Sequence, residues 1–255
     1  MDPSRFDSIA EKLDVGEPLS DFDISELSST TNLLRLGALA DERRRCESGD
    51  RVTFVRVFEV IFGEKINSQK VPDTAGEVRI IGCRDSIDDV VQEVQRVVSL
   101  SGLVPVAGFK LEDLVSLCGG ESERFEQLVL SLKQSGLACV SEVSVDSDID
   151  VSWIECCVGM GLPINSAVIQ SSVMSADVAA NRIKGWNHAY GIQAFSPLPK
   201  KLLSEPTTGY KDVHRVALAR VLVDNIPSIQ VDWVLYGPKL AQVALAFGAN
   251  DVDRV

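Results

Sequence analysis

Three carboxylates are the strongest candidates for proton-transfer chemistry in this sequence. Glu59, Glu142 and Asp232 each lie in an apolar run of strand-like composition. A carboxylate held in a pocket can act as a general acid or base. Because parallel strands present their carboxyl ends at one edge of a sheet, we expect the three side chains at that edge. They are the candidate catalytic residues if the protein is an enzyme of non-redox chemistry, which is one of the alternatives considered below.

Five further residues have the chemistry of ligand binding. Arg84 and Ser86 lie at the predicted start of a helix, where free backbone N–H groups favour an anion. The structural alternative is that Ser86 only caps the helix. Trp233 and Tyr236 could stack on a planar ring, and Lys239 lies at another predicted helix start. We predict ligand contacts for all five, with a packing role as the open alternative.

The cysteines and histidines do not form a recognisable reactive site. The six cysteines include no CxxC or CxxxCxxC pattern, and the only histidines are His188 and His214. We therefore predict no metal site and interpret the cysteines as small apolar residues in a reducing compartment. A Ser-His-Asp elbow, a Walker loop and a GxGxxG turn are also lacking, which excludes the common signatures of hydrolases and nucleotide-binding proteins.

Composition limits the partners of the protein. The 255-residue chain has a formal net charge of -12, and 45% of its residues are hydrophobic. A strongly acidic balance argues against binding to nucleic acid or to anionic membrane surfaces. The sequence has no apolar run of about 18 residues that could span a membrane, and its N-terminus is unlike a secretory signal. We expect a cytoplasmic protein with a sizeable core.

Alternating strands and helices must position these residues. Residues 1–48 predict a small N-terminal helical segment, which ends in a helix with an apolar face at Leu33, Leu36 and Leu39. From residue 49 to residue 255, runs typical of strands alternate with runs that have the apolar spacing of helices. Strand-like runs cover residues 52–62, 78–81, 104–106, 138–143, 164–169, 192–195 and 229–234. Runs typical of helices cover residues 86–100, 123–135, 176–190, 209–226 and 237–247.

Repeated βα units of this kind predict an α/β fold with a parallel sheet and right-handed crossovers. We expect a (βα)n barrel of the TIM type, partial or modified, over residues 49–255, and an open doubly wound sheet is the alternative. Function in a barrel lies at the C-terminal ends of the strands. The candidate residues there are Glu59, Gly82, Arg84, Lys110, Glu142, Gln170, Ser171, Ser196, Lys200, Asp232, Tyr236 and Lys239.

Several segments carry a resemblance to a known family. The matching parts are the tail over residues 206–227 and 230–253, which includes Trp233-Val-Leu-Tyr-Gly-Pro-Lys239, and the segments 36–45, 49–56 and Ala194-Phe-Ser-Pro-Leu-Pro199. They resemble the aminofutalosine synthase group of radical S-adenosylmethionine (SAM) enzymes, which serve menaquinone biosynthesis. The resemblance implies a radical SAM barrel, and it implies SAM and a [4Fe–4S] cluster as cofactors.

The cluster motif of that family is missing here. The family holds its cluster with a CxxxCxxC loop after the first barrel strand, whereas no cysteine lies between Cys46 and Cys83 in this chain. Thiolates are the usual cluster ligands, and Glu64, Lys65 and Asn67 are poor replacements. We therefore expect no cluster.

Two further departures concern SAM and the barrel mouth. The family's double glycine after the second strand, which helps to seat SAM, reads Gly82-Cys83-Arg84 here, and a side chain in place of a glycine hinders close backbone approach. The family also continues past Asp253, so we expect a mouth that is more open or is covered by a partner. A rescued cluster on Cys83, Cys139 and a third cysteine is the open alternative.

Three functional hypotheses follow. The first is a degenerate radical-SAM-like protein without cofactors, a binding or accessory protein linked to menaquinone biosynthesis that carries a small aromatic or nucleoside-like ligand. The second is an enzyme of non-redox chemistry that uses carboxylates at the mouth. The third is a structural subunit that pairs with an active radical SAM enzyme of the same pathway.

Overall fold

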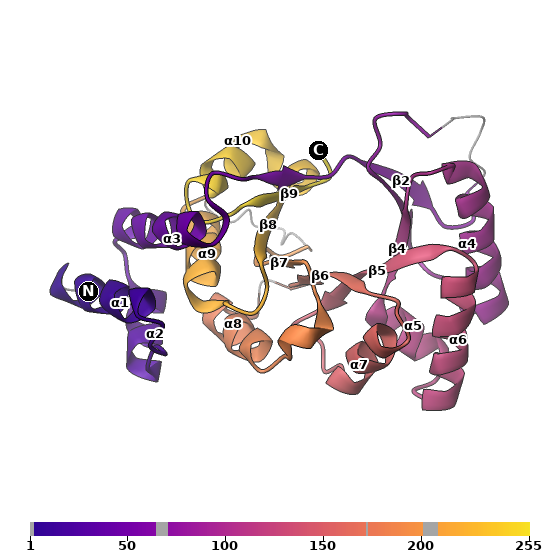
Figure 1. The fold of residues 1–255 in the computed structure, drawn as a ribbon, viewed down its shortest axis with the longest axis horizontal. Coiled ribbons are helices and arrows are strands. Elements are labelled where there is room, and N and C mark those ends of the chain that lie inside the picture. The colour runs from indigo at the N-terminus through magenta and orange to yellow at the C-terminus, as the bar shows by residue number, and fades with distance from the viewer. Residues whose placement is uncertain (1–2, 65–70, 172, 201–208) are drawn as a thin grey trace.

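The protein is a curled parallel sheet with helices on its outside (Figure 1). The computed structural model describes residues 3–64, 71–171, 173–200 and 209–255. Within these residues nine strands follow the order β1-β9-β8-β7-β6-β5-β4-β3-β2, and all neighbouring strands are parallel. The sheet therefore has the curled, TIM-like arrangement of a half-barrel, in agreement with the predicted fold class.

The strands are short and most of them lie on the predicted runs. They are β1 (Thr53–Phe54), β2 (Val57–Ile61), β3 (Glu77–Ile81), β4 (Val106–Lys110), β5 (Leu137–Ser144), β6 (Ile164–Val168), β7 (Ala194–Ser196), β8 (Ser228–Asp232) and β9 (Asp251–Asp253). The helices that cover them are α4 (Ile87–Ser101), α5 (Leu111–Leu117), α6 (Ser122–Gln134), α7 (Val151–Gly159), α8 (Ala176–Lys184), α9 (Gly209–Leu222) and α10 (Trp233–Leu245), with a 3-10 turn at His188–Tyr190.

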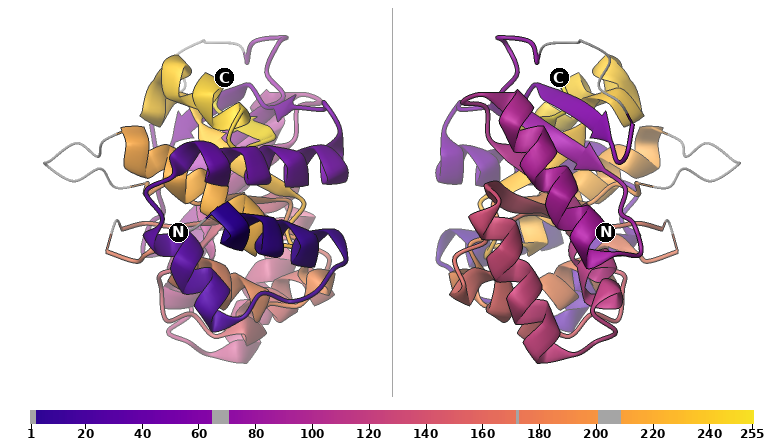
Figure 2. Two further views of the ribbon diagram at one scale, coloured as in Figure 1. Left: turned by 90° about the vertical axis from the view of Figure 1, so that its left-hand side faces the viewer. Right: turned by 90° about the vertical axis from the view of Figure 1, so that its right-hand side faces the viewer.

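The N-terminal segment forms three helices, α1 (Pro3–Asp14), α2 (Asp21–Ser29) and α3 (Leu33–Ser48). They lie on the side of the molecule opposite to α4 and α6 (Figure 2). Helix α3 buries Leu36 and Ala40, and it packs mainly on α9. Gly37 allows α3 to pack closely against Phe247, because a Cβ atom at this position would clash with the Phe247 ring.

One bent stretch of chain joins the two edges of the sheet. Strand β1 pairs with β9, whereas β2, only three residues further on, pairs with β3. At the bend, Val55 N–H donates to the Val252 carbonyl at 3.1 Å, and the Arg56 carbonyl accepts from Gly76 N–H at 2.9 Å. The stretch therefore links the two edges of the sheet: Thr53 and Phe54 pair with β9, and the residues from Val57 onward pair with β3.

The elements depart from the sequence prediction in a few places. The predicted run over residues 52–62 is divided into β1 and β2, and residues 176–190 form α8 plus a separate turn. Strand β9 and helices α5 and α7 were not predicted. Helix α10 begins at Trp233 rather than at residue 237, and Gly237 interrupts it with a φ of 79°.

None of the helices in the described part of the chain combines the length and apolar character needed to cross a membrane.

Candidate functional site

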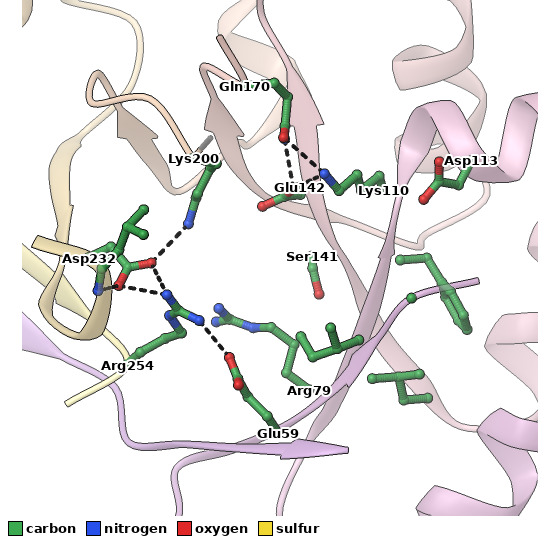
Figure 3. A pocket seen from close by; sticks show the side chains of 15 residues that line it. Glu59, Arg79, Lys110, Asp113, Ser141, Glu142, Gln170, Lys200, Asp232 and Arg254 are labelled. Atoms are coloured by element: carbon green, nitrogen blue, oxygen red, sulfur yellow. Dashed lines mark hydrogen bonds and ion pairs between the residues drawn. The ribbon is translucent and has the colours of Figure 1, made fainter. Parts of the chain in front are cut away.

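A cavity of about 380 Å³ lies at the C-terminal ends of the strands, where barrel enzymes hold their active sites. Residues on or shortly after the strands from β2 to β9 line it (Figure 3). The lining residues are Glu59, Arg79, Ile80, Ile81, Gly82, Phe109, Lys110, Asp113, Ser141, Glu142, Gln170, Lys200, Asp232, Leu235 and Arg254. The wall thus combines apolar side chains with four acidic and four basic ones.

An ion-pair network forms one side of the mouth. Arg254 donates from Nη1 to Glu59 on β2 at 2.8 Å, and its Nη2 lies 2.9 Å from Asp232 at the end of β8. Lys200 Nζ lies 3.3 Å from the same Asp232 carboxylate. Asp232 also accepts from Leu235 N–H at 2.8 Å, which caps α10. Arg254 therefore spans the gap between β2 and β8 on the side where β2 has left β9.

A second group of charges lies deeper in the barrel. Arg79 donates from both terminal nitrogens to Asp253, at 2.8 and 2.9 Å, and from Nε to Glu77 at 2.5 Å. All three residues are at least nine-tenths buried. Burial opposes the charged form of Asp253, but the hydrogen bonds from Arg79 outweigh it and hold the pKa of Asp253 below its usual value. The group therefore remains charged and joins β3 to β9.

The opposite side of the mouth holds a smaller polar group. Lys110 Nζ, at the end of β4, lies 3.3 Å from Glu142 on β5 and donates to Gln170 Oε1 at 2.9 Å. Gln170 Nε2 donates to Glu142 at 2.9 Å. The three side chains thus satisfy one another, and they lie across the cavity from Asp232 and Arg254 (Figure 3).

Two buried polar atoms of the lining residues have no hydrogen-bond partner among the described residues: Ser141 Oγ and Arg254 Nε. Ser141 is only 8% exposed, and a buried hydroxyl is normally paired with protein or water. In addition, Phe109 and Arg254 have φ angles of 66° and 59° and are the only non-glycine residues in the described ranges with a positive φ. Strained backbone and unpaired polar atoms of this kind concentrate at functional sites.

The three predicted catalytic carboxylates, Glu59, Glu142 and Asp232, all line the cavity. Each is held by at least one cation, as described above. Of the other candidate mouth residues, Gly82, Lys110, Gln170 and Lys200 also line it, whereas Ser171 and Ser196 do not. A catalytic role for the carboxylates stays a prediction.

The five predicted ligand-binding residues lie outside this cavity. Ser86 Oγ accepts from Asp89 N–H at 3.3 Å and caps α4, and Arg84 lines a neighbouring hollow with Cys83 and Asp113. Trp233, Tyr236 and Lys239 lie on α10, the first two being half-buried. Tyr236 donates to the Pro199 carbonyl at 2.7 Å. Ligand contact by these five residues stays a prediction.

The sequence prediction missed four polar lining residues: Arg79, Asp113, Ser141 and Arg254. Arg79 and Ser141 lie in the middle of strands, and side chains of a strand alternate between the two faces. Assigning every residue of β3 and β5 to the inner or outer face by this alternation, and not only the residues at the strand ends, would have placed Arg79 and Ser141 inside the barrel. Asp113 lies in α5 and Arg254 directly follows β9, and neither element was predicted. No local sequence signal therefore identified these two residues.

The cysteines do not fit an iron–sulfur cluster. None lines the cavity, and burial raises the pKa of the Cys83 thiol and raises that of Cys139 to about 12, which disfavours the thiolate form that metals require. No set of three His, Cys, Asp or Glu side chains in the described ranges could hold a metal ion. Lys65 and Asn67, considered above as replacement ligands, lie outside the described residues.

Comparisons of the sequence with known proteins find similarity to one group of related enzymes. A family model described as "CofH/MqnC C-terminal region" matches residues 196–255. The 5-amino-6-(D-ribitylamino)uracil–L-tyrosine 4-hydroxyphenyl transferase of Archaeoglobus fulgidus is 24% identical over 273 residues, covering 84% of this chain and 79% of that enzyme. The aminodeoxyfutalosine synthase of Thermus thermophilus is 44% identical over 63 residues, or 25% of this chain and 16% of that enzyme.

The fold comparison extends over the whole chain. The crystal structure of methylornithine synthase superposes with a TM-score of 0.67 at 14% identity, covering 97% of this chain and 86% of that chain. This likeness shows a curled, TIM-like α/β barrel fold. The chain spans less than half the length of several curated relatives that it matches. It is similar to radical SAM enzymes of the CofH, MqnC and aminofutalosine synthase types.

Proposed function

We propose that this protein is a radical-SAM-like barrel that has left radical chemistry and binds a small planar ring compound, aromatic or nucleoside-like, in its mouth. The observation that carries the proposal is the lining of the cavity. It contains ion pairs, an unpaired serine and an apolar wall, and it contains no cysteine. Ligand sites commonly combine apolar walls with a few placed polar groups.

The residues of this chain do not fit a cluster-dependent reaction. A [4Fe–4S] cluster requires convergent thiolates, whereas the sequence between Cys46 and Cys83 holds none. Instead, Arg254, Glu59 and Asp232 join one another across the mouth. The proposal therefore assigns this protein a binding or accessory role.

The relatives support the ring-shaped ligand and the pathway. The name of the Archaeoglobus fulgidus transferase contains a substituted uracil and a hydroxyphenyl group, both of which are planar rings. The tail similarity to an aminodeoxyfutalosine synthase supports a place beside menaquinone biosynthesis.

A thermal-shift panel tests the proposal. Purified protein is heated with adenosine, 4-hydroxybenzoate, 4-ethylphenol and SAM, and we expect at least one ring compound to raise Tm by a few degrees. Binding to the native state alone stabilises it by RT ln(1 + [L]/Kd), and about 1 kcal/mol corresponds to roughly 2–4 °C for a chain of this size.

A matched pair of variants locates the binding site. Ser141→Leu fills part of the cavity and should abolish the shift while leaving the Tm of the free protein nearly unchanged. Ser99→Leu, on the exposed face of α4, should retain the shift. No shift with any compound, or equal shifts in both variants, contradicts binding in the mouth. Iron and sulfide bound stoichiometrically after anaerobic reconstitution would contradict the non-radical role.

An enzyme of non-redox chemistry is the second candidate. The observation that favours it is that Glu59, Glu142 and Asp232 all line one cavity. Against it, each carboxylate already forms an ion pair with Arg254, Lys110 or Lys200. A structural partnership with an active pathway enzyme is the third, and co-purification from the native host tests it.

A further inference from the structure

The four cations of the mouth are all engaged by carboxylates. Arg254 contacts Glu59 and Asp232, and Lys200 contacts Asp232. The remaining two are held in the same way: Arg79 by Glu77 and Asp253, and Lys110 by Glu142. An anionic ligand would therefore have to compete with a carboxylate that already occupies each cation.

One carboxylate of the lining is left over. Asp113, on α5, has neither a hydrogen bond nor an ion pair within the described ranges, although it lines both the mouth and the neighbouring hollow. Its charge acts on its surroundings, because it adds to burial in raising the pKa of Cys83. The side chain lies beyond Lys110 as seen from the cavity centre, away from the network around Arg254 (Figure 3).

The cavity is also lined by a hydroxyl group and an apolar wall, in addition to the Arg254 network and Asp113. Ser141 Oγ is buried and has no partner among the described residues, and the adjoining wall consists of Ile80, Ile81, Phe109 and Leu235. A hydroxyl can both donate and accept, so it would pair with a ring substituent of either kind. The free polar groups of the site thus comprise one anion, one hydroxyl and the single N–H of Arg254 Nε.

We infer that the mouth binds a ring compound that carries an amine and discriminates against the same ring carrying a carboxylate, with Asp113 as the partner of the amine. This inference rests on the proposed function and specifies the charge of its ligand. An ammonium group would pair with Asp113 without disturbing another contact. A carboxylate would find only the single N–H of Arg254 Nε free among the cations of the lining. It would also meet the unbalanced charge of Asp113, and like-charge contacts oppose binding.

Three phenols that share a two-carbon chain on the ring and differ in its terminal group test the inference. Tyramine, 4-ethylphenol and 3-(4-hydroxyphenyl)propionate are cationic, neutral and anionic at pH 7, and calorimetric titration gives the affinity of each. We expect tyramine to bind most tightly, by at least about tenfold over the propionate, because one well-placed charge contact has about that effect. The neutral phenol should lie between them.

Two variants assign the preference to Asp113. Asp113→Asn should reduce the advantage of tyramine over 4-ethylphenol to less than about twofold, with the affinity for 4-ethylphenol unchanged. Asp224→Asn removes one exposed carboxylate from the loop between α9 and β8, at the opposite end of the strands, and should leave all three affinities unchanged.

The outcomes separate the inference from the proposed function. Binding of the propionate as tightly as tyramine, or an unchanged tyramine preference in Asp113→Asn, overturns the inference while ring binding stands. The same holds if adenosine stabilises the protein and none of the phenols binds. Failure of every compound in both experiments overturns the proposed function as well.

Discussion

Arg79 is the residue on which the interior charge of the barrel depends. Its guanidinium serves Asp253 and Glu77, and all three side chains are nearly inaccessible. Replacing Arg79 with methionine keeps much of the side-chain volume, leaves the buried Glu77 carboxylate without its cation, and leaves the buried Asp253 carboxylate with only Lys200, 3.9 Å away. Removing one partner of a buried ion pair costs about 3–5 kcal/mol. We expect a loss of that size in the free energy of unfolding, measured with urea.

The matched control is Arg45→Met. Arg45 also pairs with a carboxylate, Asp41 at 2.8 Å, but its side chain is 63% exposed. Exposed ion pairs contribute at most about 1 kcal/mol. Similar losses in the two variants would show that the interior group is not held by charge.

At the scale of residues, the sequence identified the carboxylates and their partners Lys110, Gln170 and Lys200, but it did not identify Arg254. Glu59, Glu142 and Asp232 were recognisable because a charged residue in an apolar run is unusual. Arg254 has no such local signal, since it follows a three-residue strand and its importance arises only when the curled sheet brings β2 near β8. Asp113 lies in the first turn of α5, where an acidic residue is common and does not by itself indicate a site.

Among the elements, α2 shows how one carboxylate can join two helices. Asp23 accepts from Lys12 Nζ of α1 at 2.7 Å and from Ser20 N–H and Oγ, which completes a capping box. The hydrogen bond from Lys12, followed by that from Ser20, lowers the pKa of Asp23 from 3.8 to about 2. The ionised form is therefore favoured by folding.

The lowered pKa predicts a pH dependence of stability. The contribution of Asp23 is fully present above the ordinary carboxyl pKa of about 4 and is lost as the pH falls toward about 2, because the unfolded chain then binds the proton first. We expect Asp23→Asn to lower the free energy of unfolding by about 1–2 kcal/mol at pH 6. Urea unfolding between pH 6 and pH 2.5 should show a shallower decline in this variant than in the wild type.

Asp7→Asn provides the comparison for that experiment. Asp7 lies on α1 and its side chain is 76% exposed, with Arg35 at 3.9 Å. Its replacement should leave both the stability at pH 6 and the decline toward low pH nearly unchanged. An equal flattening of the decline in both variants would mean that the cap is not its source.

Element prediction succeeded where one face of a strand or helix packs against apolar neighbours. It failed for β9, whose sequence is Asp-Val-Asp, because the barrel interior at this point is polar. Asp251 accepts a hydrogen bond from Gln230, and Asp253 accepts one from Arg79. Val252, which lies between the two in the sequence, is buried. The division between β1 and β2 was also missed, since it reflects two different pairing partners and leaves the apolar run unbroken.

In the whole molecule, Arg220 joins the N-terminal helices to the barrel. Its side chain is fully buried on α9. The guanidinium donates to Glu47 of α3 at 2.7 Å, to the Gly248 carbonyl at 2.8 Å and to Asn250 Oδ1 at 2.6 Å. Asn250 in turn accepts from Ile229 N–H and donates to Ser48 Oγ. The sequence predicts a boundary at residue 48, and this contact set joins the segments on either side of it.

This arrangement predicts coupled loosening of distant segments. In Arg220→Met, hydrogen exchange of backbone amides should accelerate together in α3 and in residues 248–253, because one guanidinium satisfies acceptors in both. Helices α4 and α6, on the far side of the molecule (Figure 2), should keep their protection at the level set by global stability. Arg43→Met, which removes only the 2.5 Å pair of a half-buried cation with the same Glu47, should change neither segment. Faster exchange of α3 alone would show that the helical segment opens independently of the barrel, and the support provided by Arg220 would then be local.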